Sequence, residues 1–474
     1  MTSSGPRLNR YPTFVGLIAV TATVPVIAQQ STDAFLQQQR QVEQSLLEEF
    51  DAAIPPTQQI SVDYGGWYNF FGFLYDDGVE SSRTLRLNDL RLWGSLSAAG
   101  GAHTGLVRGR LSYDDFNTGD SFDGNDDDWV GPNLERGWYR FDLNPALRAY
   151  GGESSPVDFN FQIGRQYVEF GTGYALSLPL DALTVTAKAA DVQVTGLWGT
   201  TIRSFSDIDR TRPGSDGSDR DFFGVQITYQ GFERHEPFAY TFWNSDDRGE
   251  SPVDPLQNYD YDAYYMGFGS RGELLTHLRY GNEWVFEHGR SYGDRKFLHR
   301  DDINAWGWDL QLEYLWPVKT RPRFLLEYMF ASGDPDRLFS PTDARGGNTR
   351  GDDTSFVAFG YRDTGLSFAP RLSNIHIWRG GASFFPFERI SALRRLETGT
   401  DWFLYWKHHR DGAISDPLAD RQSGYGGWEM DTFANWRITS DLALTVRYGV
   451  FFPGSTFSDQ TTRTFLLTGV TYSF

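Results

Sequence analysis

Apolar and polar side chains alternate along many segments of the chain beyond residue 60. In the segment 305–314, apolar side chains occupy every even position from Trp306 to Tyr314, and glycine or polar residues occupy the odd positions between them. The segment 442–452 repeats this pattern, with apolar residues at the even positions. A period of two is typical of a β-strand with one apolar face, so each such segment predicts a strand.

About eighteen segments of this kind follow one another, separated by stretches rich in Gly, Asp, Asn and Ser. They lie near residues 60–75, 82–98, 102–114, 133–147, 157–169, 181–188, 190–199, 221–230, 236–244, 259–269, 274–287, 302–315, 321–332, 374–386, 399–409, 424–437, 440–452 and 461–474. Their lengths approach the roughly 9 to 11 residues with which a strand crosses a bilayer, whereas strands of soluble proteins average about five or six. A water-soluble β-sandwich or propeller is therefore the weaker alternative.

The lengths of the connections support a membrane barrel. If the N-terminus is periplasmic, the connections after odd-numbered strands are extracellular and should be the longer ones. The long connections are 115–132, 200–220, 245–258, 288–301, 333–373 and 410–423, and all of them follow odd strands. We therefore predict an all-β fold for residues 60–474, a transmembrane antiparallel β-barrel of about 18 strands in the outer membrane of a Gram-negative-type cell.

The first 59 residues follow a different pattern. Arg7 and Arg10 precede an apolar stretch from residue 14 to 27 that is too short to span a bilayer, and a small-residue cleavage site ends at Ala28. Residues 1–28 are therefore interpreted as a signal peptide, with an uncleaved anchor as the alternative. Apolar residues at helical spacing predict a short N-terminal helix over 31–50, in a periplasmic segment 29–59 that could dock a periplasmic partner or be a disordered leader.

Composition narrows the class of protein further. The chain has 474 residues, a formal net charge of -19 and no cysteine. Its mean hydropathy is -0.47, and the mature chain contains no run of about 18 apolar residues that would form a membrane helix. The acidic balance argues against nucleic acid as a partner, and the absence of cysteine excludes disulfides and thiolate metal sites. Acidic clusters such as Asp126-Asp127-Asp128 are either solvated loops or sites for divalent cations.

The alternation also predicts which charged side chains face the lumen. A charge on the lipid face costs about 2 to 4 kcal/mol near the midplane, so basic residues opposite apolar ones should be lumenal or near the rims. Arg91, Arg108, Arg110, Arg136, Arg140, Arg447 and Lys407 are predicted to point inward on this basis. Two interpretations stay open: they pair with inward acids such as Asp89, Asp142, Asp309 and Glu327 to brace the wall, or they attract an anionic solute.

Several short motifs resemble the alginate-export family of outer-membrane porins. They are Asp89-Leu90-Arg91-Leu92-Trp93, Glu135-Arg136 with Tyr139, Ile163-Gly164-Arg165-Gln166, Tyr328-Met329-Phe330-Ala331-Ser332-Gly333-Asp334, Leu372-Ser373-Asn374-Ile375, Leu404-Tyr405-Trp406-Lys407 and Arg447-Tyr448-Gly449-Val450-Phe451-Phe452-Pro453-Gly454. Together they keep the order of the family and cover most of residues 60–474. The resemblance implies an eighteen-stranded export channel for an anionic uronate polymer, with an Arg-rich constriction.

The resemblance implies Arg91, Arg136, Arg165 and Arg447 as constriction residues. Arg165 shares its phase with Ile163, which should face lipid, so either Gly164 marks a bulge that reverses the phase or Arg165 lies at a rim. Gly469 stands where some members of the family carry an inward acid, which puts alginate itself in question. The glycine-rich connection 333–373 is the candidate lid or gate.

The predicted function is an outer-membrane channel for export or diffusion of an anionic polysaccharide or anionic saccharides, surrounded by outer-membrane lipid and lipopolysaccharide. The alternatives are a general porin and a surface adhesin barrel. We expect no enzyme activity and no cofactor or metal, because the eight histidines are scattered and the adjacent His408 and His409 would point to opposite faces of a strand.

Overall fold

The computed structural model describes residues 60–76, 78, 82–121, 127–202, 220–246, 261–292, 300–337, 348, 350–416 and 418–474. The predicted signal peptide, the helix over 31–50 and the segment up to residue 59 lie outside these residues. No described helix is long and apolar enough to cross a membrane.

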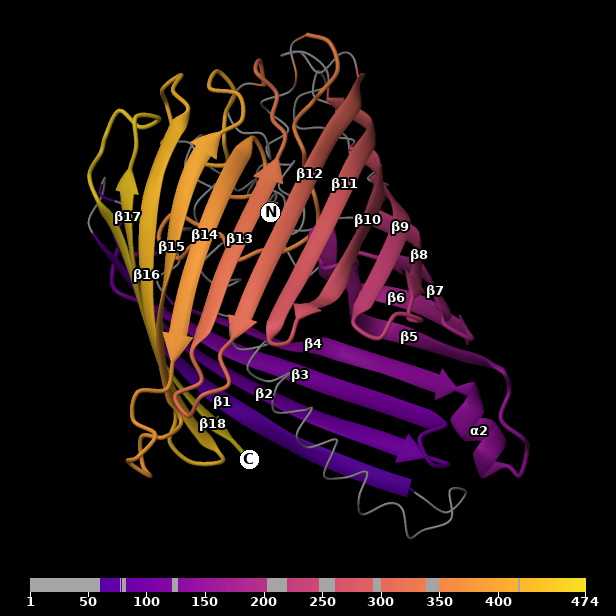
Figure 1. Cartoon of the computed structure of the whole chain (residues 1–474). Helices are drawn as coiled ribbons and strands as arrows, with labels where there is room; N and C mark the ends of the chain where they lie inside the picture. Colours follow the sequence, from indigo (N-terminus) through magenta and orange to yellow (C-terminus); the bar gives the residue numbers. More distant parts are fainter. Residues whose placement is uncertain are drawn as a thin grey trace, which may run out of the picture.

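The described chain forms eighteen antiparallel strands, which confirms the predicted strand number (Figure 1). The strands are β1 (Ile60–Asp76), β2 (Arg83–Ala98), β3 (His103–Phe116), β4 (Asp127–Asp142), β5 (Val157–Phe170), β6 (Leu176–Ala189), β7 (Val192–Thr200), β8 (Arg220–Tyr229), β9 (His235–Asp246), β10 (Asp262–Leu275), β11 (Leu278–Tyr292), β12 (Arg300–Leu315), β13 (Arg323–Ala331), β14 (Ile375–Phe384), β15 (Leu396–Lys407), β16 (Tyr425–Arg437), β17 (Leu442–Pro453) and β18 (Arg463–Ser473). Each strand pairs with its neighbours in the chain, and β1 pairs with β18 to close the barrel. Closure leaves no terminal edge strand.

Several predicted strand bounds are wrong by five or six residues: the fourth strand begins at Asp127 rather than 133, the sixth begins at Leu176 rather than 181, and the tenth ends at Leu275 rather than 269. The fourth strand was expected to reach residue 147, but β4 ends at Asp142 and a short helix, α2 (Leu143–Ala149), follows it. This helix makes the connection from β4 to β5 (Figure 1), one of the connections predicted to be periplasmic. Pro145 stands in its first turn, a position that proline tolerates because the N–H groups there need no partner within the helix.

Alternation along the strands separates a lipid face from an inner face. On β1, Trp67, Asn69 and Phe71 are buried, whereas Tyr68 and Phe70 between them are exposed. The exposed set is apolar because hydrocarbon surrounds the barrel, and the inner set is mixed. The extracellular half of the interior holds most of the buried apolar side chains, which join the inner wall to segments that fold into the barrel.

Candidate functional site: the constriction inside the barrel

The long connection between β13 and β14 enters the barrel. Residues 350–373 of the suspected lid are described, and their aromatic side chains pack inside: the Phe356 ring stacks on Tyr174 with centroids 5.7 Å apart, and the Phe368 ring stacks on Phe451 at 4.4 Å. Phe356 is fully buried. The segment therefore narrows the lumen, and we call residues 350–373 the inner loop.

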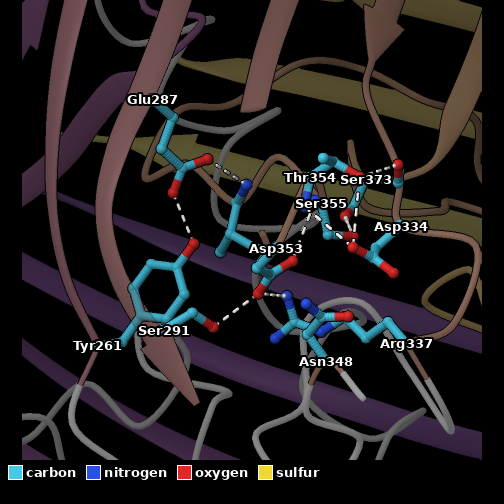
Figure 2. A network of polar contacts seen from close by, with 12 residues as sticks. Tyr261, Glu287, Ser291, Asp334, Arg337, Asn348, Asp353, Thr354, Ser355 and Ser373 are labelled. Atoms are coloured by element: carbon cyan, nitrogen blue, oxygen red, sulfur yellow. Dashed lines mark hydrogen bonds and ion pairs between the residues drawn. The ribbon is translucent and has the colours of Figure 1, made fainter. Parts of the chain in front are cut away.

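The root of the inner loop is a polar network on the extracellular side (Figure 2). The buried Asp353 carboxylate pairs with Nη1 of Arg337 at 2.9 Å and accepts the Ser291 hydroxyl at 2.6 Å. The Thr354 N–H donates to Asp334 at 3.1 Å. Burial, followed by the neighbouring Asp336, raises the pKa of Asp334 to about 6. The loop is thus fixed where it leaves the wall.

A carboxylate of the wall holds the next stretch. The backbone N–H of Val357 donates to Glu287 on β11 at 2.8 Å, and Tyr261 donates to the same carboxylate at 2.6 Å (Figure 2). The hydroxyl of Tyr265 donates to the Val357 carbonyl at 2.5 Å. Buried backbone N–H and C=O groups need hydrogen-bond partners. Side chains of the wall provide these partners for the loop, as a neighbouring strand would in a sheet.

A second segment crosses the lumen beside the inner loop. The extracellular end of the β5–β6 hairpin, residues 166–180, reaches the opposite wall: the N–H of Thr172 donates to Glu283 on β11 at 2.5 Å. Phe359 pairs with the start of β6 as a parallel bridge to Leu176. A Cβ atom at Gly360 would lie 1.8 Å from the Tyr174 carbonyl oxygen, so only glycine permits this close approach.

Arg362 joins the inner loop, the hairpin and the wall. Its Nε and Nη2 atoms donate to the buried Asp309 at 2.9 and 2.7 Å, and its Nη1 atom donates to the Thr172 carbonyl at 3.0 Å. Burial lowers the pKa of Arg362, but the carboxylates of Asp309, Glu283 and Glu327 outweigh this effect and raise it above its ordinary value. Arg362 is therefore a permanent charge that fixes the constriction.

The far end of the inner loop is held by Glu429 on β16. Its carboxylate accepts the N–H groups of Leu366, Ser367 and Phe368 at 2.6, 2.6 and 2.9 Å. Between these anchors lies Tyr361, whose pKa is raised by burial and then by the Asp363 carboxylate, and lowered by the charge of Arg447. The two inner segments are thus anchored along their length, as expected of a fixed constriction.

Three predicted site residues form one ion-pair cluster on the inner wall of β2–β4. Arg91 pairs with Asp89 at 2.5 Å and with Glu135 at 3.0 Å, Arg108 pairs with Glu135 at 2.6 Å, and Arg110 pairs with Asp89 at 2.6 Å. Glu135 is the extra residue of a bulge in the β3–β4 ladder. Two carboxylates hold these three cations, which is the wall-bracing arrangement with one positive charge left over.

Four further predicted residues lie apart from that cluster. Arg140 pairs with Asp142 at 2.7 Å, and Nζ of Lys407 donates to the carbonyls of Gly412 and Arg421. The Arg136 guanidinium lies 5.2 Å from the ring centroid of Tyr167. Arg165 pairs with Asp181 at 2.8 Å and donates to the Leu134 carbonyl at 2.7 Å. The β5–β6 ladder runs through Gly164 without a register shift, so the bulge explanation for Arg165 is wrong.

Arg447 differs from the other predicted cations. It pairs across the ladder with Leu467, which is buried on the inner face, so Arg447 points into the lumen. Within the described ranges no carboxylate forms an ion pair with Arg447, and its Nε atom is buried without a hydrogen-bond partner. Its charge acts on Tyr361 of the constriction.

Sequence analysis missed the residues that build the constriction. Arg362, Glu287 and Glu429 were not singled out, and the inner loop was assigned to the cell surface. The available signal was the aromatic content of the loop, because Phe356, Phe359 and Phe368 are out of place in a solvated connection. Within the described part of the chain, no three His, Asp or Glu side chains come together as ligands of a metal ion.

Comparison with known proteins supplies an independent assignment. The model of a protein family described as Alginate export matches residues 80–469, most of the chain. No curated protein matches it.

Among solved structures, Pseudomonas aeruginosa OccK8 (OprE) aligns with a TM-score of 0.54 at 11% identity, over 87% of this chain and 98% of that one. A BenF-like porin from Pseudomonas fluorescens Pf-5 gives the same four values. Pseudomonas aeruginosa OpdK with vanillate aligns with a TM-score of 0.51 at 12% identity, over 88% and 99%. At such low identity these likenesses establish the fold alone.

Proposed function

Because the chain belongs to the alginate export family, we propose that this outer-membrane channel passes anionic saccharides in single file past the inner loop. The sugar carboxylates would be attracted by Arg447. The observation that carries the proposal is the position of Arg447, an inward cation beside Tyr361 with no ion-pair partner among the described residues.

The electrostatics of the lumen favour this position over the other predicted cations. Arg91, Arg108 and Arg110 are fixed against the wall by Asp89 and Glu135, which cancel two of their three charges. A guanidinium without an acid partner keeps its field, and a low-dielectric wall focuses that field into the lumen. Such a site attracts a carboxylate but binds it weakly enough for the solute to move on.

The geometry of the constriction favours a narrow solute. Two segments cross the lumen, and buried groups such as Arg362 and Glu429 hold them in place. An extended uronate chain or a short saccharide could pass only one residue at a time. Aromatic side chains such as Tyr361 offer flat faces for sugar rings, which matches the mixed chemistry of saccharide sites.

Planar-bilayer recordings with the Arg447→Gln variant test the proposal. In a potassium chloride gradient, the reversal potential should move toward cation preference, and block by an oligouronate should weaken. Arg437→Gln is the matched control, because Arg437 lies at the end of the neighbouring strand and donates to the Ser440 carbonyl near the periplasmic turn. Equal effects of both variants, or none for Arg447→Gln, would reject Arg447 as the selective group.

A small aromatic carboxylate is the second candidate solute. It is suggested by the likeness to OpdK, whose solved structure contains vanillate. Vanillate and an oligouronate, tested in turn as blockers of the same channel, separate the two classes. Block by vanillate alone would replace the saccharide in the proposal while leaving the role of Arg447 intact.

A further inference from the structure

Among the described residues, the barrel wall has a seam where β4 and β5 do not pair. Their ladder covers residues 137–142 of β4 and 160–165 of β5, although β4 continues to pair with β3 as far as Asp127. All residues from 127 to 134 are exposed, whereas exposure alternates along β1 and β18. Within the described ranges no strand pairs with this edge of β4, and the Leu134 carbonyl accepts the Arg165 guanidinium at 2.7 Å.

The seam opens because β5 leaves the wall. Beyond Arg165, β6 is the partner of β5 among the described strands, and their shared hairpin crosses the lumen to reach Glu283. Gly164, with a φ of +122°, stands at the departure point, where a Cβ atom would lie 2.2 Å from the Gly137 carbonyl oxygen. The inward hairpin that narrows the channel is thus the same segment that withdraws from β4.

The seam lies at the depth of the lipid. Tyr113 and Trp129 pack on the outer face with ring centroids 4.9 Å apart, as expected of an interfacial aromatic girdle. The ion pair between Arg86 and Asp115 stands just beyond them along the strands. Residues 130–136 are on the membrane side of this boundary, and a free strand edge in hydrocarbon would leave backbone groups unsatisfied. Irregular backbone at this depth is tolerated where it lines a water-filled cavity.

A cation and apolar side chains lie on opposite faces at the seam. Arg136 pairs across the ladder with the buried, inward Arg108, and its guanidinium lies over the Tyr167 ring. Arg165 has the outer phase of Ile163, and its charge is matched by Asp181. On the outer face, Leu134 and Ile163 are about half exposed and apolar. A cation toward the lumen and apolar groups toward the bilayer match a molecule with an anionic head and a hydrocarbon chain.

We propose that this seam is a lateral portal through which a single-chain anionic amphiphile passes between the lumen and the outer leaflet. The headgroup contacts Arg136, and the chain leaves between Leu134 and Ile163. The portal is a second route, separate from the axial path beside Arg447. An experiment that rejects the portal therefore leaves the proposed axial function standing, and the reverse is also true.

A reversible lock tests the portal, because the chain has no native cysteine. Continuing the ladder from Gly137 and Arg165 would set Asn133 opposite Glu169, so a bismaleimide linker with a reducible bond should join Asn133→Cys/Glu169→Cys across the open seam. A direct disulfide would need Cα atoms within about 7 Å. Thr186→Cys/Thr195→Cys is the matched control, because these residues already pair across β6–β7. The probe is dodecanoate with a diazirine in its chain, and the same chain as an alcohol tests the need for charge.

In proteoliposomes, we expect dodecanoate to label residues 130–136 and 165–169 in the reduced protein, and the alcohol to label them much less. The linker should abolish this labelling in the lock variant, leave the control unchanged, and keep the axial ion conductance. Arg136→Gln should weaken dodecanoate labelling in the reduced state. Labelling that survives the lock, or that spreads evenly over outer-face residues such as Trp402 and Phe223, would overturn the portal and indicate annular lipid only.

Discussion

Replacing Arg362 by glutamine should loosen the constriction. The guanidinium donates twice to Asp309 and once to the Thr172 carbonyl, and it lies 3.8 Å from Glu327. Glutamine retains much of the length but not the charge. The substitution leaves Asp309, which is 2% exposed, without its main cation.

Two estimates of the free energy lost in the Arg362→Gln variant agree. Hydrogen bonds to charged groups contribute about 1.5–3 kcal/mol each, so the two bonds to Asp309 amount to roughly 3–6 kcal/mol. Removing one partner of a buried ion pair costs about 3–5 kcal/mol. A loss of about 4 kcal/mol should release residues 359–365 from the hairpin. The inner loop keeps its anchors at Glu287 and Glu429, so the barrel itself should remain folded.

Single-channel recording is the primary assay, with urea unfolding in liposomes beside it. The Arg362→Gln channel should conduct more current with more open-state noise, and its unfolding midpoint should fall. Arg323→Gln is the control, because Arg323 also pairs with a glutamate, Glu313, but its side chain is 44% exposed at the periplasmic end. Exposed pairs contribute about 0–1 kcal/mol, so this control should behave as the parent.

The double variant Arg362→Gln/Asp309→Asn separates charge from anchoring. Removing both charges should restore most of the unfolding midpoint, because no uncompensated carboxylate is left buried. The larger conductance should persist, because the loop still lacks its clamp. Unchanged conductance in both variants would refute the assignment of Arg362 as the group that holds the constriction.

Two further predictions concern the wall and the rim. Glu135→Ala should lower the free energy of unfolding by about 3–5 kcal/mol, because Arg91 and Arg108 stay buried without that carboxylate; a loss below about 1 kcal/mol in urea titration would contradict this role. Burial and two neighbouring histidines lower the pKa of His408 from 6.5 to about 4. The unfolded chain then binds the extra proton, so stability should fall as the pH drops from 6.5 toward 4. His408→Asn keeps an acceptor for the Gly333 N–H and should flatten the pH profile of the melting midpoint; an unchanged slope would exclude His408 as its source.

The strands were predictable because hydrocarbon imposes a local rule. Every second side chain must be apolar wherever lipid touches the wall, so the period of two marks strands without knowledge of their partners. The same rule gave a wrong prediction of a strand at residues 143–147. Leu143, Pro145 and Leu147 alternate there with polar or small residues, as in a strand. The backbone there forms α2, because the chain has left the hydrocarbon and must turn toward β5.

The constriction was less predictable because its contacts span distant parts of the chain. The aromatics Phe356, Phe359 and Phe368 indicate that the connection is buried somewhere. Their docking positions depend on Glu287 and Glu429, which in the sequence look like ordinary inward acids of strands. Only the closed sheet brings those carboxylates to the backbone groups that they bind.

For the charged residues of the lumen, alternation along the strands predicts only part of the structure. Alternation indicates the face on which an arginine lies, but the partner depends on the register of the adjacent strand. The bulge at Glu135 turns that carboxylate inward between Arg91 and Arg108, so two cations that look available in the sequence are matched in the barrel. Arg447 obeys the same alternation, yet its ladder partners Phe433 and Leu467 carry no charge. Its field is therefore left to act on whatever passes through the lumen. Under the proposed function, this difference in register partners makes Arg447 the selective arginine and the ion-paired ones structural.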